Sequence, residues 1–267
     1  MTDSKIAPLP LSIFFSERAA VAAGITLLAT DVDGTLTRDG ALTPDTLAAI
    51  ETLTDAGVEV VPVSGRPAGE LLGLCRYLPG VRKGIAENGL VSVVPDAPVR
   101  FIGAPTDTSR LRTIGDALNA EYAAGLQLTG DVFCRVGDVA YERDGRDVAE
   151  LMRLRAAAEG LGAFFVWSSV HVHLAERVPD KGEGLLSMLE RWGVSPAAVA
   201  TIGDAPNDAG LFTPNRFGLT VGTADVLAQA DDFPHLPQTV TSGRELDGFL
   251  ELARGLLESR GVQTPTH

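Results

Sequence analysis

The amino-acid sequence predicts an α/β fold in which a core built on a doubly wound parallel sheet carries an inserted α+β cap domain. At both ends of the chain, short apolar runs alternate with helical segments, the order expected of a parallel sheet. The middle of the chain instead indicates hairpins mixed with two helices. The length of 267 residues fits a medium domain plus a smaller one, because domains commonly hold about 100–200 residues.

The first part of the core predicts the order strand, helix, strand, helix, strand. Residues 25–30 (ITLLAT) form an apolar run that ends at Asp31, as a buried strand of a parallel sheet would. Thr43 and Pro44 are typical of a helix N-cap and first turn, and Gly57 is expected to end this helix. The next expected elements are a strand over 58–63, a helix over 67–77 and a short strand over 85–87.

The middle of the chain predicts a separate α+β unit. Turn residues 95–98 (PDAP) separate two short apolar runs, and Gly137 and Asp138 join another pair, so hairpins are expected. Two helical segments lie among these strands. The expected strands cover 90–94, 99–102, 132–136, 139–143, 163–167 and 170–174, and the expected helices cover 109–123 and 147–161.

The α/β alternation returns in the last third of the chain. The expected elements are a helix over 182–192, a helical turn at 195–196, strands over 199–203 and 217–221, and a terminal helix over 245–258. The simplest organisation is therefore a discontinuous core, an inserted cap and an N-terminal arm. These domains are predicted to cover 25–88 with 178–260, 89–177 and 1–24, respectively.

Composition and charge argue against several classes of partner. Lys plus Arg number 22 and Asp plus Glu 35, so the formal net charge of −13 disfavours nucleic acid and anionic membranes. No apolar run reaches the ~18 residues of a membrane span. Glu17 and Arg18 closely follow the apolar run near the N-terminus, which argues against a signal peptide. Cys75 and Cys134 form no disulfide framework, so we expect a cytoplasmic protein, whose oligomeric state the sequence leaves open.

The most informative stretch is 31–37 (DVDGTLT), directly after the first predicted strand. Because strand side chains alternate, Asp31 and Asp33 can point the same way from the edge where open α/β sheets bind ligands. Two adjacent carboxylates repel, so a proton or a cation is expected between them. An ionised aspartate can attack phosphorus, and a protonated one can supply the leaving group with a proton. A solvated turn is the alternative, but a calcium loop is excluded because Leu36 and Leu42 stand where it needs Gly and Glu.

Two further polar segments belong to the same sheet edge. Ser64 and Gly65 follow the second predicted strand, and a hydroxyl with a backbone N–H can hold a phosphate oxygen. Arg66 could pair with phosphate, with a substrate carboxylate or with a surface acid. Lys181 begins a predicted helix, where a lysine and the helix dipole together can neutralise an anion. Each feature alone is also explained by turn chemistry or by a solvated lysine.

The last polar segment is 203–208 (GDAPND), after the predicted strand over 199–203. Asp204 and Asp208 are four residues apart around a turn and can converge on one hard divalent cation. Magnesium suits such a site because it takes one or two carboxylates and keeps several waters. Turn chemistry explains the same residues in isolation, but four polar strand ends in chain order favour one shared site.

These motifs resemble the haloacid-dehalogenase-like phosphatase superfamily, whose core has a Rossmann-like sheet. The resemblance rests on 31–37, on Ser64-Gly65-Arg66, on Lys181 and on 203–208. A cap between the second and third motifs, preceded by Glu87-Asn88-Gly89, is similar to the sugar-phosphatase subgroup, which includes sucrose-phosphate and phosphoglycolate phosphatases. The stretch 168–174 (SSVHVHL) is most similar to those two kinds of enzyme. Ala205 departs from the serine of many members, although Asp204 is kept.

The resemblance implies a role for each matching residue. Asp31 is implied as nucleophile and magnesium ligand, and Asp33 as general acid and base that binds magnesium through its carbonyl. Asp204 is implied as a further ligand, supported by Asp208. The residues expected to bind phosphate or substrate are Ser64, Gly65, Arg66, Asn88, His173, Lys181 and Asn207, with Arg135 as a second cap candidate beside His173.

The implied function is a magnesium-dependent phosphatase that hydrolyses a small phosphorylated metabolite through a phosphoaspartyl intermediate. The substrate is expected to be a sugar phosphate or a phosphorylated hydroxy acid such as phosphoglycolate. Two alternatives stay open: a phosphosugar mutase with the same chemistry, and a phospho-accepting signalling domain without turnover. An acyl-enzyme mechanism is disfavoured because the chain has no Gly-x-Ser-x-Gly pattern.

Overall fold

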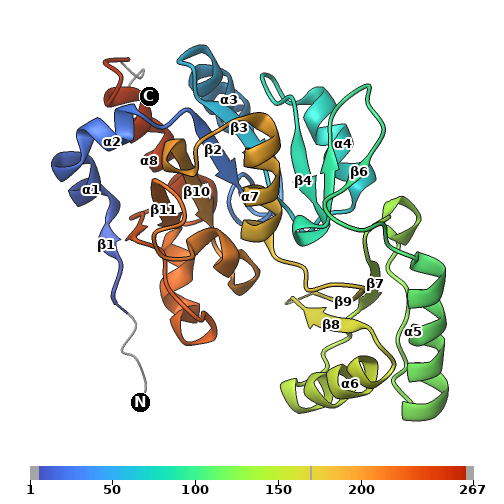
Figure 1. Ribbon diagram of the computed structural model, residues 1–267. Coiled ribbons are helices and arrows are strands. Elements are labelled where there is room, and N and C mark those ends of the chain that lie inside the picture. Colours follow the sequence, from blue (N-terminus) through green and yellow to red (C-terminus); the bar gives the residue numbers. More distant parts are fainter. Residues whose placement is uncertain (1–5, 169, 263–267) are drawn as a thin grey trace.

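The computed structural model describes residues 6–168 and 170–262, and its centre is a six-stranded sheet in which neighbouring strands are parallel (Figure 1). This sheet confirms the predicted α/β class. Its order is β1-β12-β11-β10-β2-β3. The strands are β1 (Leu9–Pro10), β2 (Leu27–Thr30), β3 (Glu59–Pro62), β10 (Val199–Gly203), β11 (Leu219–Gly222) and β12 (Thr239–Val240).

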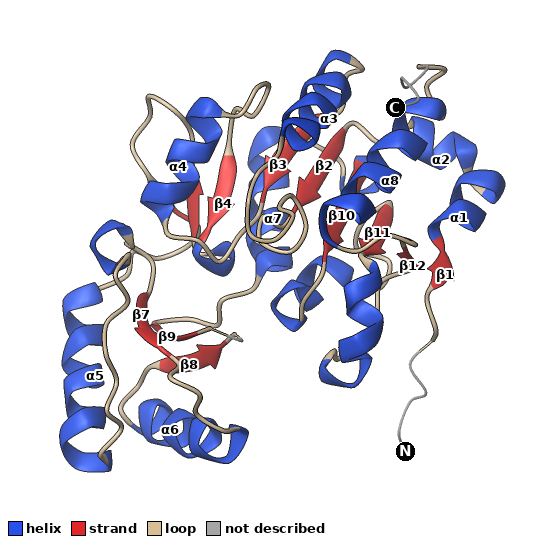
Figure 2. Ribbon diagram, turned by 180° about the vertical axis from the view of Figure 1, so that it is seen from behind, coloured by secondary structure: helices blue, strands red, loops and turns tan. Residues whose placement is uncertain are grey.

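The sheet is covered on both faces by helices, chiefly α3 (Pro44–Asp55), α8 (Glu245–Glu258) and α7 (Lys181–Trp192). Side chains alternate along β2, so that Leu28 joins the apolar cluster of α3 and α8 while Leu27 and Ala29 join that of α7. Figures 1 and 2 show α7 on one face and the other two helices on the opposite face. This double burial explains the continuous apolar run that predicted the strand.

The short strand expected over 85–87 joins a second sheet instead of the parallel one. β4 (Gly84–Ala86) pairs antiparallel with β5 (Val91–Val93), which pairs with β6 (Arg100–Phe101). A parallel bridge between Val63 and Ile85 links β4 to the main sheet. The turn after β4 explains the difference, because Glu87 and Asn88 in the 3-10 segment η1 (Glu87–Gly89) both have a φ of 53°, which turns the chain back into the hairpin.

The β5–β6 hairpin, which the sequence places in the cap, packs with the core. Val91 and Val93 belong to the same apolar cluster as Leu28 of β2, and helix α4 (Ala68–Tyr77) contacts both β4 and β5. The predicted start of the cap at residue 89 stays a prediction. Because this hairpin packs with the core, we propose that the cap begins later and covers residues 104–176.

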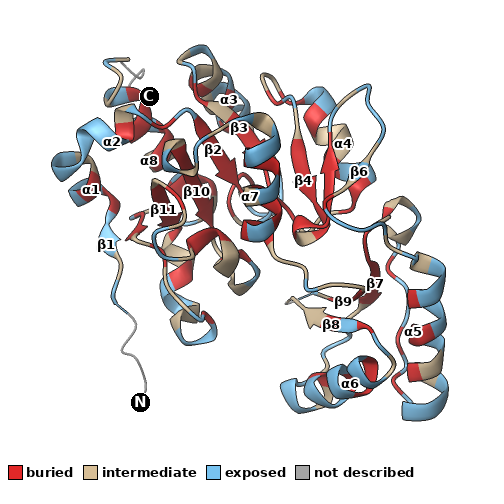
Figure 3. Ribbon diagram, viewed as in Figure 1, coloured by how far each residue is buried: buried red, intermediate tan, exposed pale blue. Residues whose placement is uncertain are grey.

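The inserted segment has its own sheet and its own core. The antiparallel order is β7-β9-β8, from β7 (Val139–Glu142), β9 (His171–Ala175) and β8 (Phe164–Trp167). Helices α5 (Thr108–Tyr122) and α6 (Val148–Gly160) lie on the side of this sheet away from the main sheet (Figure 2). Leu111, Leu154 and Phe165 are among the residues of its apolar cluster. Figure 3 shows that the outer turns of both helices are exposed whereas β7 is buried.

The strand expected over 132–136 is wrong, because Val132–Cys134 forms a short 3-10 helix, η2. The N–H groups of Val136, Gly137 and Asp138 are bonded to the carboxylate of Glu87, so this segment does not supply them to a strand partner. A side chain from a distant part of the chain therefore decides the local structure. Three other 3-10 segments lie in the core: η3 (Pro196–Ala198), η4 (Pro206–Phe212) and η5 (Ala224–Asp232).

The N-terminal arm completes one edge of the core. β1 pairs in parallel with β12, while α1 (Leu11–Glu17) and α2 (Ala19–Ala23) contact α8. Leu11 and Phe14 are buried in the core cluster. Residues 1–5 of the predicted arm lie outside the described residues. Within the described ranges, no helix is both long enough and apolar enough to cross a membrane.

Candidate active site

The polar strand ends that the sequence singles out meet at one edge of the parallel sheet. Because β2 lies between β10 and β3, the residues that follow these strands, Asp31, Ser64 and Asp204, are neighbours. Lys181, the first residue of α7, reaches the same place. One carboxylate oxygen from each of Asp31, Asp204 and Asp208 lies within 4.8 Å of the others. The structure thus gathers a lysine and three carboxylates at the carboxyl end of the sheet.

Lys181 is fully buried between two of these acids. Its Nζ lies 2.9 Å from Oδ1 of Asp31 and 2.6 Å from Oδ1 of Asp208. Burial lowers the pKa of Lys181, but Asp208 and Asp31 outweigh this effect and raise that pKa above its ordinary value. Lys181 is therefore a fixed positive charge beside the Asp31 carboxylate.

Asp208 also holds the loop that carries Asp204. Its Oδ2 accepts hydrogen bonds from the N–H groups of Asp204 at 2.9 Å and Ala205 at 3.1 Å. Ala205 makes this hydrogen bond through its backbone N–H. The bond therefore does not need the serine that many proteins with a similar motif have at this position. Asp208 therefore supports the cluster by fixing both Lys181 and the loop.

Gly34 allows Asp204 to approach the first motif. A Cβ at position 34 would lie 2.4 Å from Oδ2 of Asp204, and the φ of +77° at Gly34 is one that other residues rarely adopt. The Asp204 carboxylate also accepts a hydrogen bond from the Thr35 hydroxyl at 3.1 Å. The sequence 31–37 therefore supplies both the nucleophile candidate and the space for a carboxylate from β10.

The acidic cluster fits a hard divalent cation. Burial, followed by repulsion from Asp208, raises the pKa of Asp31 to about 7 and that of Asp204 to about 8. Carboxylates that crowd each other in this way are stabilised by a cation, and a donor set made only of oxygens suits magnesium. Asp31 and Asp204 are the residues that would hold the ion directly.

Asp33 points away from the acidic cluster and pairs with Arg66. The guanidinium binds the Asp33 carboxylate through two hydrogen bonds of 2.7 and 2.8 Å and also bonds Glu70 at 2.9 Å. Arg66 is thus engaged with two acids in this structure, which is the surface-acid alternative left open by the sequence. The carboxyl of Asp33 remains half exposed beside the cavity.

Ser64 and Asn88 form the floor of the site next to the acids. Ser64 is buried, and its Oγ accepts the Arg66 N–H at 3.2 Å. Asn88 lies against Gly65, where an added Cβ would be 3.1 Å from the Asn88 Oδ1. That oxygen is buried and has no hydrogen-bond partner within the part of the chain that the structure describes. An unpartnered buried oxygen on a left-handed residue is consistent with a polar ligand in this place.

Most of the predicted site residues line one cavity of about 490 Å³ between the core and the cap, whereas Lys181 and Asp208 are fully buried and are not part of its lining. A second cavity of about 240 Å³ shares Asn88, His173 and Asn207 with it. Asn207 thus lies at the wall of both cavities, and its contact with phosphate stays a prediction. The larger cavity is lined by Asp31, Asp33, Ser64, Gly65, Arg66, Pro67, Glu70, Asn88, Asp131, Arg135, Ser168, Val170, His171, His173, Asp204, Ala205 and Asn207.

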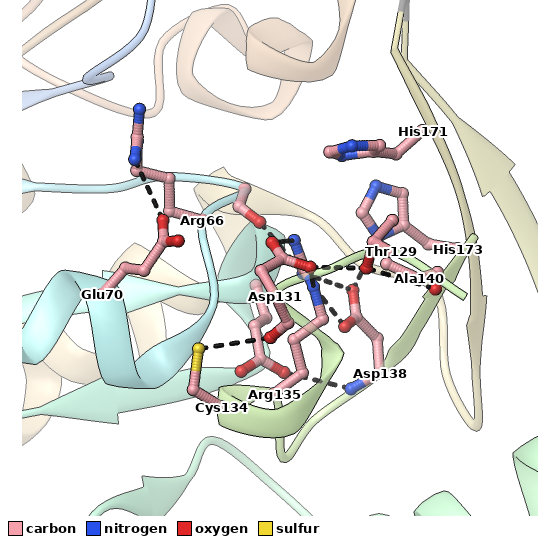
Figure 4. A network of polar contacts seen from close by, with 12 residues as sticks. Arg66, Glu70, Thr129, Asp131, Cys134, Arg135, Asp138, Ala140, His171 and His173 are labelled. Atoms are coloured by element: carbon pink, nitrogen blue, oxygen red, sulfur yellow. Dashed lines mark hydrogen bonds and ion pairs between the residues drawn. The ribbon is translucent and has the colours of Figure 1, made fainter. Parts of the chain in front are cut away.

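Arg135 connects the cap to the core (Figure 4). Its guanidinium donates to Asp131 at 3.0 Å, to Asp138 at 3.1 Å and to the carbonyl oxygen of Gly65 at 3.2 Å. Arg135 lines the cavity with these bonds in place, and its role in receiving a substrate group stays a prediction. His173, the other cap candidate, stays at the cavity wall. Ser169, which belongs to the resembling stretch, lies outside the described residues.

Glu87 is a residue whose role the sequence did not reveal. Its buried carboxylate accepts hydrogen bonds from the N–H groups of Ala68 at 2.9 Å, Val136 at 3.1 Å and Asp138 at 3.0 Å, and from that of Gly137. One acid of the core thus binds the first turn of α4 and a loop of the inserted segment. Only its place in Glu87-Asn88-Gly89 marked it, since its partners are distant in sequence.

A buried lysine among carboxylates, two of which line a capped cavity at the carboxyl edge of a parallel sheet, defines an α/β enzyme for a small anionic ligand. The chain belongs to the haloacid dehalogenase-like hydrolases, whose family model matches residues 28–96 and 139–232. Phosphoglycolate phosphatase of Natronomonas pharaonis is 33% identical over 84% of this chain and 94% of its own length. That of Pyrobaculum neutrophilum is 31% identical over 91% of this chain and 100% of its own length. The chain is therefore a hydrolase of the phosphatase type.

Solved structures agree on the fold. A protein of Thermoplasma acidophilum superposes with a TM-score of 0.72 at 18% identity and covers 90% of this chain and 99% of its own. The sucrose-phosphatase of Synechocystis, solved with sucrose and phosphate, superposes with a TM-score of 0.62 at 18% identity and covers 86% and 97%. These likenesses support the capped α/β architecture.

Proposed function

We propose that this protein is a magnesium-dependent phosphatase that hydrolyses a small phosphate monoester through a phosphoaspartyl intermediate. The observation that carries the proposal is the placement of Lys181, which is buried within hydrogen-bond distance of Asp31 and Asp208. A fixed cation beside a nucleophilic carboxylate offsets its repulsion from the phosphate dianion. The family membership of the chain supports the same chemistry.

The residues act in two steps. In the first, a carboxylate oxygen of Asp31 forms a bond to phosphorus while the bond from phosphorus to the ester oxygen breaks, and Asp33 gives its proton to that oxygen. In the second, Asp33 takes a proton from water, whose oxygen bonds to phosphorus as the bond to Asp31 breaks. Inorganic phosphate leaves and Asp33 is protonated again. Ser64, Asn207 and Lys181 hold the phosphoryl oxygens.

A magnesium ion would be held by the carboxylates of Asp31 and Asp204 and by the carbonyl oxygen of Asp33, with Asp208 in support. When bound, it supplies positive charge that neutralises the phosphate oxygens and the buried acids. The oxygen-only donor set and the raised pKa values of Asp31 and Asp204 support this assignment. We also propose a cytoplasmic location, which agrees with the two unpaired cysteines.

The proposed substrate is a sugar phosphate or a phosphorylated hydroxy acid. The relatives named phosphoglycolate phosphatases support the second class, and the cavity of about 490 Å³ suits a small metabolite. The cap closes the cavity opposite Asp31, so the cap side chains would contact the part of the substrate that leaves. Gly65, Asn88 and His173 are the proposed contacts for this part, whereas Arg66 would first have to release Asp33.

The test is a phosphate-release screen over sugar phosphates and phosphoglycolate, with magnesium or with a chelator. We expect magnesium-dependent release from at least one small monoester, and none from the Asp31→Asn variant. Formation of an isomeric sugar phosphate without free phosphate would instead identify a mutase. A stable phosphoaspartate without turnover would identify a signalling domain, and either result would overturn the proposal.

A further inference from the structure

The inserted segment contains a buried acid–imidazole pair that the proposed chemistry does not use. Nδ1 of His173 lies 2.9 Å from Oδ2 of Asp138, whose side chain is completely buried. His173 lines both cavities, and its side chain is only 5% exposed. Because Asp138 occupies Nδ1, the ring presents Nε2 to a ligand, and Nε2 has no hydrogen-bond partner among residues 6–168 and 170–262.

Acids surround the pair formed by His173 and Asp138. Burial raises the pKa of Asp138, but His173 and Arg135 outweigh it and hold that pKa below its ordinary value. Asp131 binds Arg135 beside Asp138 (Figure 4), and Glu87 accepts the backbone N–H of Asp138. The acids in this network therefore outnumber Arg135. Nε2 of His173 is the ring nitrogen left for a ligand in the cavity.

The other cations near the cavity are already paired. Arg135 is bonded to Asp131, Asp138 and the Gly65 carbonyl, and Lys181 lies between Asp31 and Asp208. Arg66 binds Asp33 and Glu70.

His171 is the neighbour that most resembles His173. Its ring centroid is 6.1 Å from that of His173, and its Nε2 lies 3.7 Å from Glu142. Burial, followed by the neighbouring His173, lowers the pKa of His171. Of these two imidazoles, His173 is therefore the one that a buried carboxylate holds beside the cavity.

We propose that His173, oriented by Asp138, binds a carboxylate on the leaving group and so selects phosphorylated hydroxy acids over neutral phosphate esters. This inference rests on the proposed function and specifies the substrate class of the same site. Asp33 and Lys181 act on the phosphoryl group, whereas His173 reads the opposite end of the substrate. Asp138 is a positioning residue, because it touches His173 and not the ligand.

The test compares two substrates that differ only at the recognised group. Phosphoglycolate carries a carboxylate where 2-hydroxyethyl phosphate carries a neutral CH2OH. The wild-type protein should show the lower KM for phosphoglycolate. In His173→Asn, the shorter amide can keep the bond to Asp138 but loses Nε2. Its KM for phosphoglycolate should rise about 10- to 100-fold, the range for one charged hydrogen bond, and this rise should exceed any rise in the KM for 2-hydroxyethyl phosphate.

Further variants separate recognition from folding. His173→Gln places an uncharged N–H closer to the position of Nε2 and should regain part of the preference. Asp138→Asn should lose preference in the same direction as His173→Asn. His235→Gln is the matched control, because His235 bonds the Ala209 carbonyl at 2.7 Å and does not line the cavity.

Two outcomes would overturn the inference while leaving the proposed function intact. One is a wild-type protein that releases phosphate from both esters with equal KM. The other is a His173→Asn variant that changes KM for both esters by the same factor. Failure of the wild-type protein to release phosphate from any ester, in the screen described above, would instead overturn the proposed function.

Discussion

The buried carboxylate of Glu87 offers a quantitative test of how the two parts of the chain are joined. The proposed change is Glu87→Gln, which keeps the size of the side chain. In the wild-type protein, Oε1 faces the Ala68 N–H, and Oε2 faces the N–H groups of Gly137 and Asp138. All of these partners donate, so a carboxylate satisfies them and an amide NH2 group does not.

The magnitude follows from these contacts. The better orientation of the new amide keeps its oxygen on the loop and turns NH2 against the Ala68 N–H. A buried N–H without an acceptor costs about 1–3 kcal/mol. The remaining hydrogen bonds become weaker because their acceptor no longer carries a negative charge. Removal of the buried charge stabilises the protein and offsets part of this loss. We expect the free energy of unfolding to fall by about 2–4 kcal/mol, a large part of the stability of a typical domain.

The assay is denaturant unfolding at pH 8.5, because burial and the charge of Asp138 raise the pKa of Glu87 to about 7 and the carboxylate must be ionised. Glu251→Gln is the matched control. Glu251 also accepts backbone N–H groups, from Ser242 at 2.7 Å and Gly243 at 3.2 Å, but through one oxygen and near solvent. In Glu251→Gln, the side-chain amide oxygen can accept the same N–H groups. The free energy of unfolding should therefore fall by less than about 1 kcal/mol. Equal losses for both variants would refute the reasoning.

Three other predictions concern the acidic site. Asp31→Asn and Asp33→Asn should each still fold but lower kcat by at least about 10²-fold; near-normal activity of Asp31→Asn would contradict the assignment of the nucleophile. Gly34→Ala should weaken magnesium binding in a calorimetric titration, because the new Cβ would lie 2.4 Å from the Asp204 carboxylate, and unchanged affinity would be inconsistent with this crowding. In the metal-free protein, Asp31 and Asp204 have pKa values raised to about 7 and 8. The native state therefore loses protons that the unfolded state has already lost, so the melting temperature should fall as pH rises from about 4 to 8. Magnesium at pH 8 should restore it, and a melting temperature that rises over this range in the metal-free protein would contradict the prediction.

The sequence was informative where local chemistry determines structure. Thr43 caps α3 by accepting the Thr46 N–H, as its position before Pro44 predicted. The apolar run before Asp31 became a strand buried on both faces, so the site at its carboxyl end could also be anticipated. Lys181 begins α7, as the sequence predicted, and it lies beside Asp31, which follows β2.

Contacts between distant residues limited the prediction. Nothing near 132–136 shows that Glu87 binds the N–H groups of the adjoining loop and that the segment forms a 3-10 turn. The ion pairs of Arg135 with Asp131 and Asp138 could not be predicted from residue type either. The sequence does not distinguish an arginine that is paired with acids from one that is free. Partner choice among charged groups is a property of the folded chain.

The N-terminal arm has a consequence for how the protein is made. β1 pairs with β12, so the outermost strand of the sheet joins segments near opposite ends of the chain. During synthesis, β1 must wait for β12 to emerge, and β12 presents an open strand edge until β1 pairs with it. The short β1 with Pro10 then covers that edge with a strand that is itself a poor template for further pairing. Removal of the arm should therefore favour association of the nascent or purified chain with other copies of itself. The catalytic edge of the sheet, which lies far from the arm, should be affected less.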